Sequence, residues 1–259
     1  MAAQRCQRLR QQAAKTYGRG DAQLALGLVP VARQRLLGAA CGGHHGGAAF
    51  DVARAGLGQR ELVGSPVLVE LLSRGHQVSA LARNPAKLAA QPGLSVVADA
   101  LDAAQVAKAV AGHDAVVSAY NPGWSEPQIH DLFLQGSRAI VEGVKRAGLK
   151  RLLVAGGAGS LFVAPGLQLV DTPPFPAEYK QGALAAREAL NQLKLETSLD
   201  WSFVSPPIAL APDVRTGLDN LLPGVGDAPA GISVADLAVA IVDEIETPRH
   251  VQKRFTVAS

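Results

Sequence analysis

The sequence predicts a single α/β domain with a doubly wound parallel sheet, preceded by an irregular N-terminal extension. From Gly64 onward, short apolar runs alternate with helical stretches of about ten residues or more, which implies parallel strands joined by right-handed crossovers. The runs are apolar almost throughout, as in strands that are covered on both faces. Of the 259 residues, 48% are hydrophobic and 18% are charged, so the chain can bury a large core and is not disordered as a whole.

The first half of this domain predicts two helices and three strands. Pro66 is typical of the first turn of a helix and Gly75 of the position after its end, so we expect a helix over residues 66–74. Asp102 is placed to cap a second helix, over residues 103–112. Apolar, β-rich runs predict the strands, over residues 77–83, 94–102 and 114–120.

The second half continues the alternation. Apolar residues on one side predict a longer helix over residues 127–147, and a second helix is expected over residues 178–194. Ser233 and Asp236 form a capping-box pattern that opens a helix running to Ile245. Three further runs predict strands, over residues 151–157, 200–208 and 254–258.

The basic charge is confined to the first quarter of the chain. Residues 1–63 hold nine Lys/Arg against three Asp/Glu, whereas residues 64–259 hold sixteen against nineteen. The larger part is therefore mildly acidic and has no basic stripe with interleaved aromatic residues, which argues against a nucleic-acid partner. No uncharged apolar run is long enough to span a membrane. We expect a small-molecule substrate, and a monomer or homodimer.

Cysteine usage indicates a reducing compartment. Cys6 and Cys41 cannot build a disulfide framework, so a cytoplasmic location fits best. Cys41, His44 and His45 match no common zinc spacing and lie on glycine-rich chain, which predicts a flexible tract and no metal site.

Residues 1–62 form an extension rich in Gly, Arg and Ala, in which no strand pattern stands out. Three explanations are open: an organelle-targeting peptide, because no acid precedes Asp21; a natural disordered extension; or translation in the wrong frame or from the wrong start. Residues 63–259 are expected to form the dinucleotide-binding domain.

Doubly wound sheets bind ligands beyond the carboxyl ends of their strands, so the loops at those ends hold the candidate site. After the strand over 77–83, Arg83 and Asn84 stand where an arginine suits the 2′-phosphate of NADPH, which favours NADP(H) over NAD(H). The other interpretation of Arg83 is a solvated surface residue. Asp99, with Ala100 and Leu101, is placed near an adenine ring or serves as a helix cap.

Two later loops carry small residues where a cofactor must approach the backbone. One holds Ser118, Ala119 and Tyr120. The other holds Gly156 and Gly157, followed by Ser160, whose hydroxyl is a candidate donor to a substrate carbonyl. A plain glycine-rich turn is the alternative interpretation of this second loop.

Several segments, in order and spacing, resemble the atypical short-chain dehydrogenase/reductases, and more narrowly the NAD(P)H-binding proteins often labelled NADH-flavin reductases. They are GSPVLVELLSRGHQVSALARNP, GHDAVVSAYNPGW, LLVAGGAGSLFVAPG, LVDTPPFPAEYK and DWSFVSPP, and the similarity runs from about Val63 to Ser259. The resemblance implies a Rossmann-like fold, a bound nicotinamide dinucleotide, and hydride transfer to a flavin, quinone or similar planar acceptor, with FMN or FAD as substrate.

The cofactor loop departs from the family pattern G-x-x-G-x-x-G. Gly58 and Gly64, next to Ser65, stand at the outer glycine positions and would face the pyrophosphate, but Glu61 occupies the middle one. A carboxylate there repels the pyrophosphate. Residues 51–57 place charges where the first, central strand should be apolar. We therefore hypothesise a frame error that ends near residue 62, and expect poor dinucleotide affinity if the chain is authentic as written.

The catalytic pattern also departs from much of the superfamily, which carries Tyr-x-x-x-Lys on a helix. Tyr179 is followed directly by Lys180, and Ala183 stands where the lysine belongs. This absence disfavours tyrosine-assisted ketone reduction, whereas flavin reduction needs less acid–base help from the protein. Tyr179 and Ser160 remain candidates for contact with the acceptor; the alternative for Tyr179 is a surface residue at a helix start. A non-catalytic NADP(H) sensor and an inactive product are the rival hypotheses.

Overall fold

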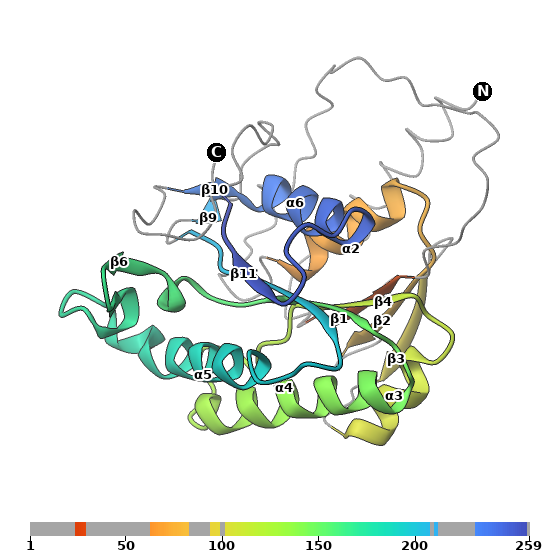
Figure 1. Ribbon diagram of the computed structural model, residues 1–259, viewed down its shortest axis with the longest axis horizontal. Coiled ribbons are helices and arrows are strands. Elements are labelled where there is room, and N and C mark those ends of the chain that lie inside the picture. The colour runs from red at the N-terminus through yellow and green to blue at the C-terminus, as the bar shows by residue number, and fades with distance from the viewer. Residues whose placement is uncertain are drawn as a thin grey trace, which may run out of the picture.

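The computed structural model describes residues 24–29, 63–82, 94–98, 102–207, 210–211 and 231–257. Helices cover both faces of a central seven-stranded sheet, as Figure 1 shows, and this confirms the doubly wound α/β class. The strands of this sheet are β1 (Leu24–Val29), β2 (Val78–Ala82), β3 (Leu94–Ala98), β4 (Ala115–Ser118), β5 (Arg151–Ala155), β8 (Asp200–Val204) and β11 (Lys253–Phe255). The α-helices are α2 (Gly64–Ser73), α3 (Ala103–Val110), α4 (Ile129–Arg146), α5 (Ala177–Leu193) and α6 (Val234–Glu246).

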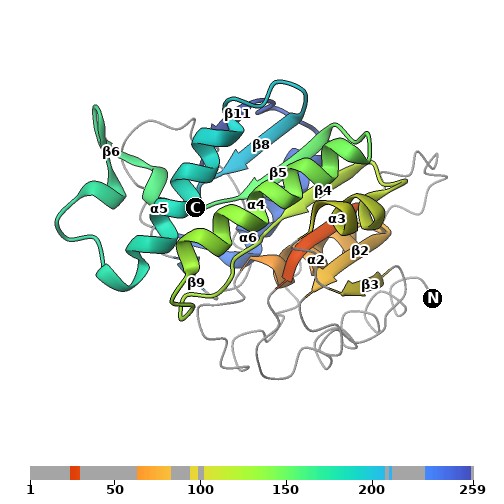
Figure 2. The ribbon, with the colours of Figure 1, turned by 90° about the horizontal axis from the view of Figure 1, so that it is seen from below.

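Each face of the sheet has its own hydrophobic core that holds these layers together. On one face, α2 and α6 pack together and bury residues such as Leu68 and Ile241 against the sheet. On the other face, seen from below in Figure 2, α3, α4 and α5 bury Val144, Leu190 and Phe203. Because both faces are covered, the strands between them are apolar, as the sequence predicts.

The sheet order is β11-β8-β5-β4-β1-β2-β3. All neighbours are parallel except β1, which runs antiparallel to both β2 and β4. The direction of β1 departs from the expected parallel sheet, and β1 itself lies in residues 1–62, where no strand pattern stands out in the sequence. The edges of β2 and β4 leave backbone groups that need partners, and a six-residue apolar run can satisfy them in either direction. Residues 51–57, which align with the first strand of the family, lie outside the described residues.

The predicted helix caps are confirmed. The carboxylate of Asp102 accepts hydrogen bonds from the backbone of Ala104 at 2.6 Å and Gln105 at 3.3 Å, which opens α3. Ser233 and Asp236 form the expected capping box at α6, where the Ser233 hydroxyl accepts from the Asp236 N–H at 3.0 Å.

Smaller elements extend the carboxyl end of the sheet and were not expected from the sequence. Between β5 and α5 the chain forms a 3₁₀ turn, a short hairpin and a second 3₁₀ turn. Between β8 and α6, two short parallel strands pair with each other. They are η3 (Ala158–Ser160), β6 (Phe162–Ala164), β7 (Leu167–Gln168), η4 (Leu169–Asp171), β9 (Leu210–Ala211) and β10 (Ile232–Ser233).

Candidate functional site

A cavity of about 350 Å³ opens at the carboxyl ends of β4, β5 and β8, where the sequence analysis places the ligand. Within the described residues, its lining comes from the start of α2, the three strand ends with the loops after them, α4, η3, η4 and the loop after it, β9 and one face of α5, and includes no charged side chain. The lining residues are Val63, Gly64, Ala119, Tyr120, Asn121, Trp124, Phe133, Ala155, Gly156, Gly157, Ala158, Gly159, Leu169, Phe175, Pro176, Tyr179, Gly182, Ala183, Ala186, Pro206, Pro207 and Leu210.

The wall formed by the strand ends and α2 consists of small residues and backbone. The first turn of α2 begins at Gly64 and contains no acidic residue, and no side chain caps it. At Gly157, an added Cβ would meet only Ala186, at 3.9 Å, so this position is open towards the cavity. An anion approaching the start of α2 would therefore face the positive end of a helix dipole across residues too small to obstruct it.

The opposite wall is aromatic. The rings of Trp124 and Tyr179 lie 5.2 Å apart, edge to face, and both side chains are partly exposed. Phe175 is partly exposed, whereas Phe133 is buried. Gly182 makes this arrangement possible, because a Cβ there would lie 2.6 Å from the Trp124 ring. This wall offers aromatic edges and faces to a ligand.

The β4–α4 loop fixes the place of Trp124. The side-chain oxygen of Asn121 accepts a hydrogen bond from the Gly123 N–H at 2.7 Å, and Gly123 has a φ of +115°, which only glycine adopts readily. Before this turn, the Tyr120 hydroxyl donates to the Leu132 carbonyl of α4 at 3.0 Å. Tyr120 is therefore a wall residue whose hydroxyl is bonded to the fold.

Ser160 lies beside the cavity rather than on its lining. It is 2% exposed, and its hydroxyl lies 2.8 Å from that of Ser205 and 3.1 Å from the Gly157 carbonyl, to which it donates. The Ser160 carbonyl accepts hydrogen bonds from Gln168 at 3.1 Å and Arg254 at 2.7 Å. Burial lowers the pKa of the Arg254 guanidinium. Ser160 thus joins the glycine loop to the hairpin and β11.

The structure brings together many of the residues expected from the sequence. Tyr179, Gly64, Ala119, Tyr120, Gly156 and Gly157 line the cavity, whereas Ser65, Ser118 and Ser160 do not. The remaining expected residues lie outside the described part of the chain: Gly58, Arg83, Asn84, Asp99, Ala100 and Leu101. Glu61 lies outside it too.

Sequence reasoning missed most of the aromatic wall and the lining face of α5. Tyr179, Gly182, Ala183 and Ala186 stand at i, i+3, i+4 and i+7, the spacing of one helix face, and this signal could have found the last three. Trp124 directly follows the Asn-Pro-Gly turn after β4, so its place at the ligand edge could also have been inferred. Leu169 and Phe175 come from η4 and the loop after it, which gave no pattern.

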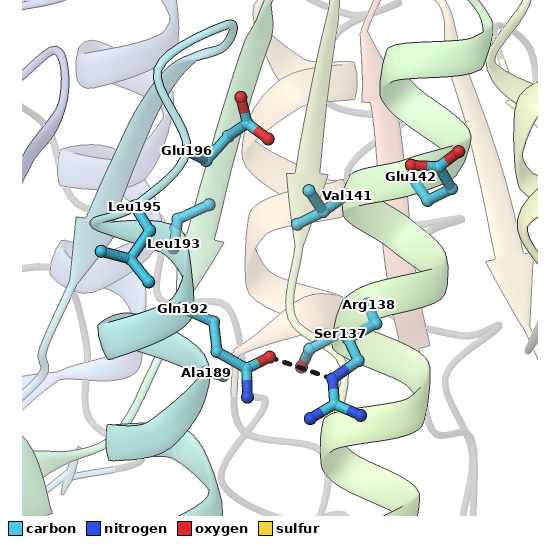
Figure 3. A pocket seen from close by; sticks show the side chains of 9 residues that line it. All are labelled: Ser137, Arg138, Val141, Glu142, Ala189, Gln192, Leu193, Leu195 and Glu196. Atoms are coloured by element: carbon cyan, nitrogen blue, oxygen red, sulfur yellow. Dashed lines mark hydrogen bonds between the residues drawn. The ribbon is translucent and has the colours of Figure 1, made fainter.

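A second depression lies on the outer surface between α4 and α5, away from the strand ends (Figure 3). Its charged side chains and Gln192 already bond to one another or to neighbours. Arg138 donates to Gln192 at 3.0 Å, and Lys145 pairs with Glu196 at 2.8 Å. The hydrogen bonds from Lys145 and Ser198 lower the pKa of Glu196 to about 2. We assign this depression to helix packing.

The described residues hold neither a candidate metal site nor a candidate membrane span. They contain no group of three or more His, Cys, Asp or Glu side chains placed to hold a metal ion. Their helices include none that is long and apolar enough to cross a membrane.

The family model described as NAD(P)H-binding matches residues 62–248, which include the whole lining of the cavity. The chain belongs to the NAD(P)H-binding family. YwnB of Bacillus subtilis, a relative without a characterised function, shares 36% identity over 212 residues, covering 78% of this chain and 96% of YwnB.

Solved structures of similar proteins agree with this membership. A candidate epimerase from Bacteroides thetaiotaomicron is 40% identical with a TM-score of 0.70, covering 76% of this chain and 91% of that chain. A candidate exported protein from Burkholderia pseudomallei is 41% identical with a TM-score of 0.67, covering 76% and 95%. A candidate NADH-flavin reductase from Streptococcus pneumoniae is 31% identical with a TM-score of 0.63, covering 75% and 93%.

The residues present fit the dinucleotide that the NAD(P)H-binding family implies. The start of α2, whose first turn has no acidic residue, would hold its pyrophosphate, and the small residues Ala119, Ala155 and Gly157 leave room for its nicotinamide end. The aromatic wall leaves the other side of the cavity for a second ring.

Proposed function

We propose that the chain is an NAD(P)H-dependent oxidoreductase, an atypical short-chain dehydrogenase/reductase, that reduces a flavin, a quinone or a similar planar acceptor. One observation carries the proposal: a cavity with a small-residue wall and an aromatic wall, uncharged in its described lining, lies at the strand ends of a chain in the NAD(P)H-binding family. The similarity to a candidate flavin reductase supports the choice of acceptor.

NADP(H) is the cofactor that we propose, because Arg83 follows β2 where a 2′-phosphate partner is expected. When bound, this cofactor supplies the hydride. The chain's own residues would orient the two rings and exclude water, since Trp124, Phe175 and Tyr179 cover the cavity with apolar surface. Tyr179 contacts the acceptor, and Ser160 holds the glycine loop in place.

Steady-state oxidation of NADPH in the presence of menadione or FMN tests this function. We expect turnover that depends on the acceptor. NADPH should also be titrated against the chain and against a version whose first strand and glycine loop follow the family pattern, and the repaired version should bind more tightly. Arg83→Ala should raise the KM for NADPH and leave that for NADH unchanged; equal effects on both would contradict the choice of NADPH.

A non-catalytic NADP(H) sensor is the second candidate, and the α5 face favours it. After Tyr179, the cavity-lining positions of α5 are Gly182, Ala183 and Ala186, none of which can transfer a proton, while Lys180 is exposed. Saturable NADPH binding without turnover by any acceptor would support the sensor. The two cysteines favour a cytoplasmic location, which cell fractionation checks.

A further inference from the structure

We propose that the acceptor is an uncharged planar ring, such as a quinone or a flavin without phosphate, and that the cavity selects against phosphorylated flavins. This inference rests on the proposed function and narrows its substrate class. It follows from the charge, the shape and the size of the cavity between Trp124 and the strand ends.

The described lining of the cavity carries no charge to pair with a phosphate group. A phosphate group needs cationic or multiple N–H partners, and leaving it desolvated without them is costly. The cavity has no charged side chain in the part of the chain that the structure describes. The free N–H donors at the start of α2 would be taken by the pyrophosphate of the bound dinucleotide. Arginines on the flanking elements are engaged with the protein: Arg187 of α5 pairs with Asp171 at 2.7 Å, and Arg254 of β11 donates to Ser160.

The shape of the aromatic wall fits a flat ligand. Trp124 and Tyr179 meet edge to face, so their two rings give the wall nearly perpendicular aromatic surfaces. Both side chains, like that of Phe175, are partly exposed although they are apolar in the main. A planar ring that stacks on them would remove this surface from water, and that burial is favourable.

The size of the cavity limits the size of the acceptor. Its volume of about 350 Å³ lies near the lower end of ligand pockets, which hold roughly 300–1,000 Å³. Stacked rings fill such a space and leave little room for a charged chain. Gly182 contributes to this volume, because any side chain there would displace Trp124.

Riboflavin and FMN test the inference directly, because they carry the same ring and differ in one phosphate. Each is titrated against the full chain at equal ionic strength with NADP⁺ present throughout, so that the start of α2 is occupied, and binding is followed by quenching of flavin fluorescence. We expect the Kd of FMN to exceed that of riboflavin by at least about fivefold. A smaller ratio, or the failure of riboflavin to bind, overturns the proposal.

Three substitutions test whether this cavity causes the preference between the two flavins. Trp124→Ala should raise the Kd of both flavins by a similar factor, because it removes the stacking surface and leaves the charge of the lining unchanged. Phe175→Lys should reverse the preference, because it adds a cation at the cavity. Leu195→Ala, at a residue that is 82% exposed on the α4–α5 depression, is the control and should change neither Kd. If Leu195→Ala reversed the preference for riboflavin over FMN, or if Phe175→Lys did not, the flavins would not be bound in this cavity as proposed.

Turnover separates this inference from the proposed function. If NADPH is oxidised by no acceptor, the proposed oxidoreductase function fails, while the ratio of the two flavin affinities still decides the charge selectivity. If NADPH oxidation proceeds with FMN at a kcat/KM equal to or above that with riboflavin and menadione, the function stands and the inference falls.

Discussion

The two ends of the sheet differ in where their charged side chains lie. At the carboxyl ends of the strands, the cavity is lined by glycine, alanine, proline and aromatic residues, with no charged side chain among those described. At the amino ends, a buried ionic network ties β5, β8 and α6 together around Glu244. The buried ionic network around Glu244 thus lies at the end of the sheet remote from the cavity, so stability and ligand binding can be altered separately.

Glu244 is the centre of that network. Its side chain is 3% exposed and accepts hydrogen bonds from Arg151 at 3.1 Å, Ser202 at 2.8 Å and the ring of His250 at 2.8 Å. The backbone N–H groups of Arg249 and His250 also donate to it. Burial alone would raise the pKa of Glu244, but these hydrogen bonds outweigh it and hold the pKa below the usual value. Burial lowers the pKa of Arg151, and Glu244 partly offsets this.

The largest effect is expected from Glu244→Gln, which leaves the charge of Arg151 buried without its counter-charge. We expect a loss of about 3–5 kcal/mol in the free energy of unfolding, measured by urea denaturation. Glu246→Gln is the control on the same helix; its carboxylate pairs with Arg74 at the surface and should contribute less than about 1 kcal/mol. Riboflavin affinity of the folded Glu244→Gln protein should be unchanged. A weakened affinity would show that the two ends are coupled.

The pH dependence of unfolding tests the contribution of Glu244 further. Because the folded pKa of Glu244 lies below its unfolded value near 4.3, its stabilisation is complete above about pH 4.3 and is lost as pH falls through the folded pKa. The stability difference between wild type and Glu244→Gln should therefore shrink below about pH 4. Glu196, whose pKa is about 2, titrates in both proteins and cancels in this difference. A difference that stays constant in acid would contradict the assigned pKa direction.

Two adjacent glycines test the carboxyl end. A Cβ at Gly156 would collide with the buried ring of Phe203, whereas one at Gly157 meets only Ala186 at an ordinary distance. We expect Gly156→Ala to destabilise the fold by about 1–3 kcal/mol and Gly157→Ala by less than about 0.5 kcal/mol. Gly157→Ala should instead weaken riboflavin binding, because its methyl group enters the cavity. Equal stability losses would show that both glycines serve packing alone.

The sequence predicted the central strands and helices of the fold better than the surroundings of the candidate site. Each strand and helix after Gly64 in the central layers was expected, because apolar runs, Asp102 and Ser233 are local signals. β1 was missed because its pairing partners lie far along the chain and its six residues give no direction. The aromatic wall was missed because Trp124 and Tyr179 meet only through the packing of a loop on α5, which sequence spacing does not record.

The smallest effect is expected from Tyr179→Phe, which decides what this aromatic wall does. Phenylalanine keeps the ring that meets Trp124, so kcat/KM with riboflavin should fall by less than about threefold, because an acceptor of this kind needs little acid help from the protein. Tyr179→Ala removes the ring and should lower kcat/KM by about tenfold. If Tyr179→Phe lowered kcat/KM as much as Tyr179→Ala and also abolished an alkaline limb of the pH profile, the Tyr179 hydroxyl would be a proton donor. The wall would then take part in the chemistry instead of only positioning an uncharged ring.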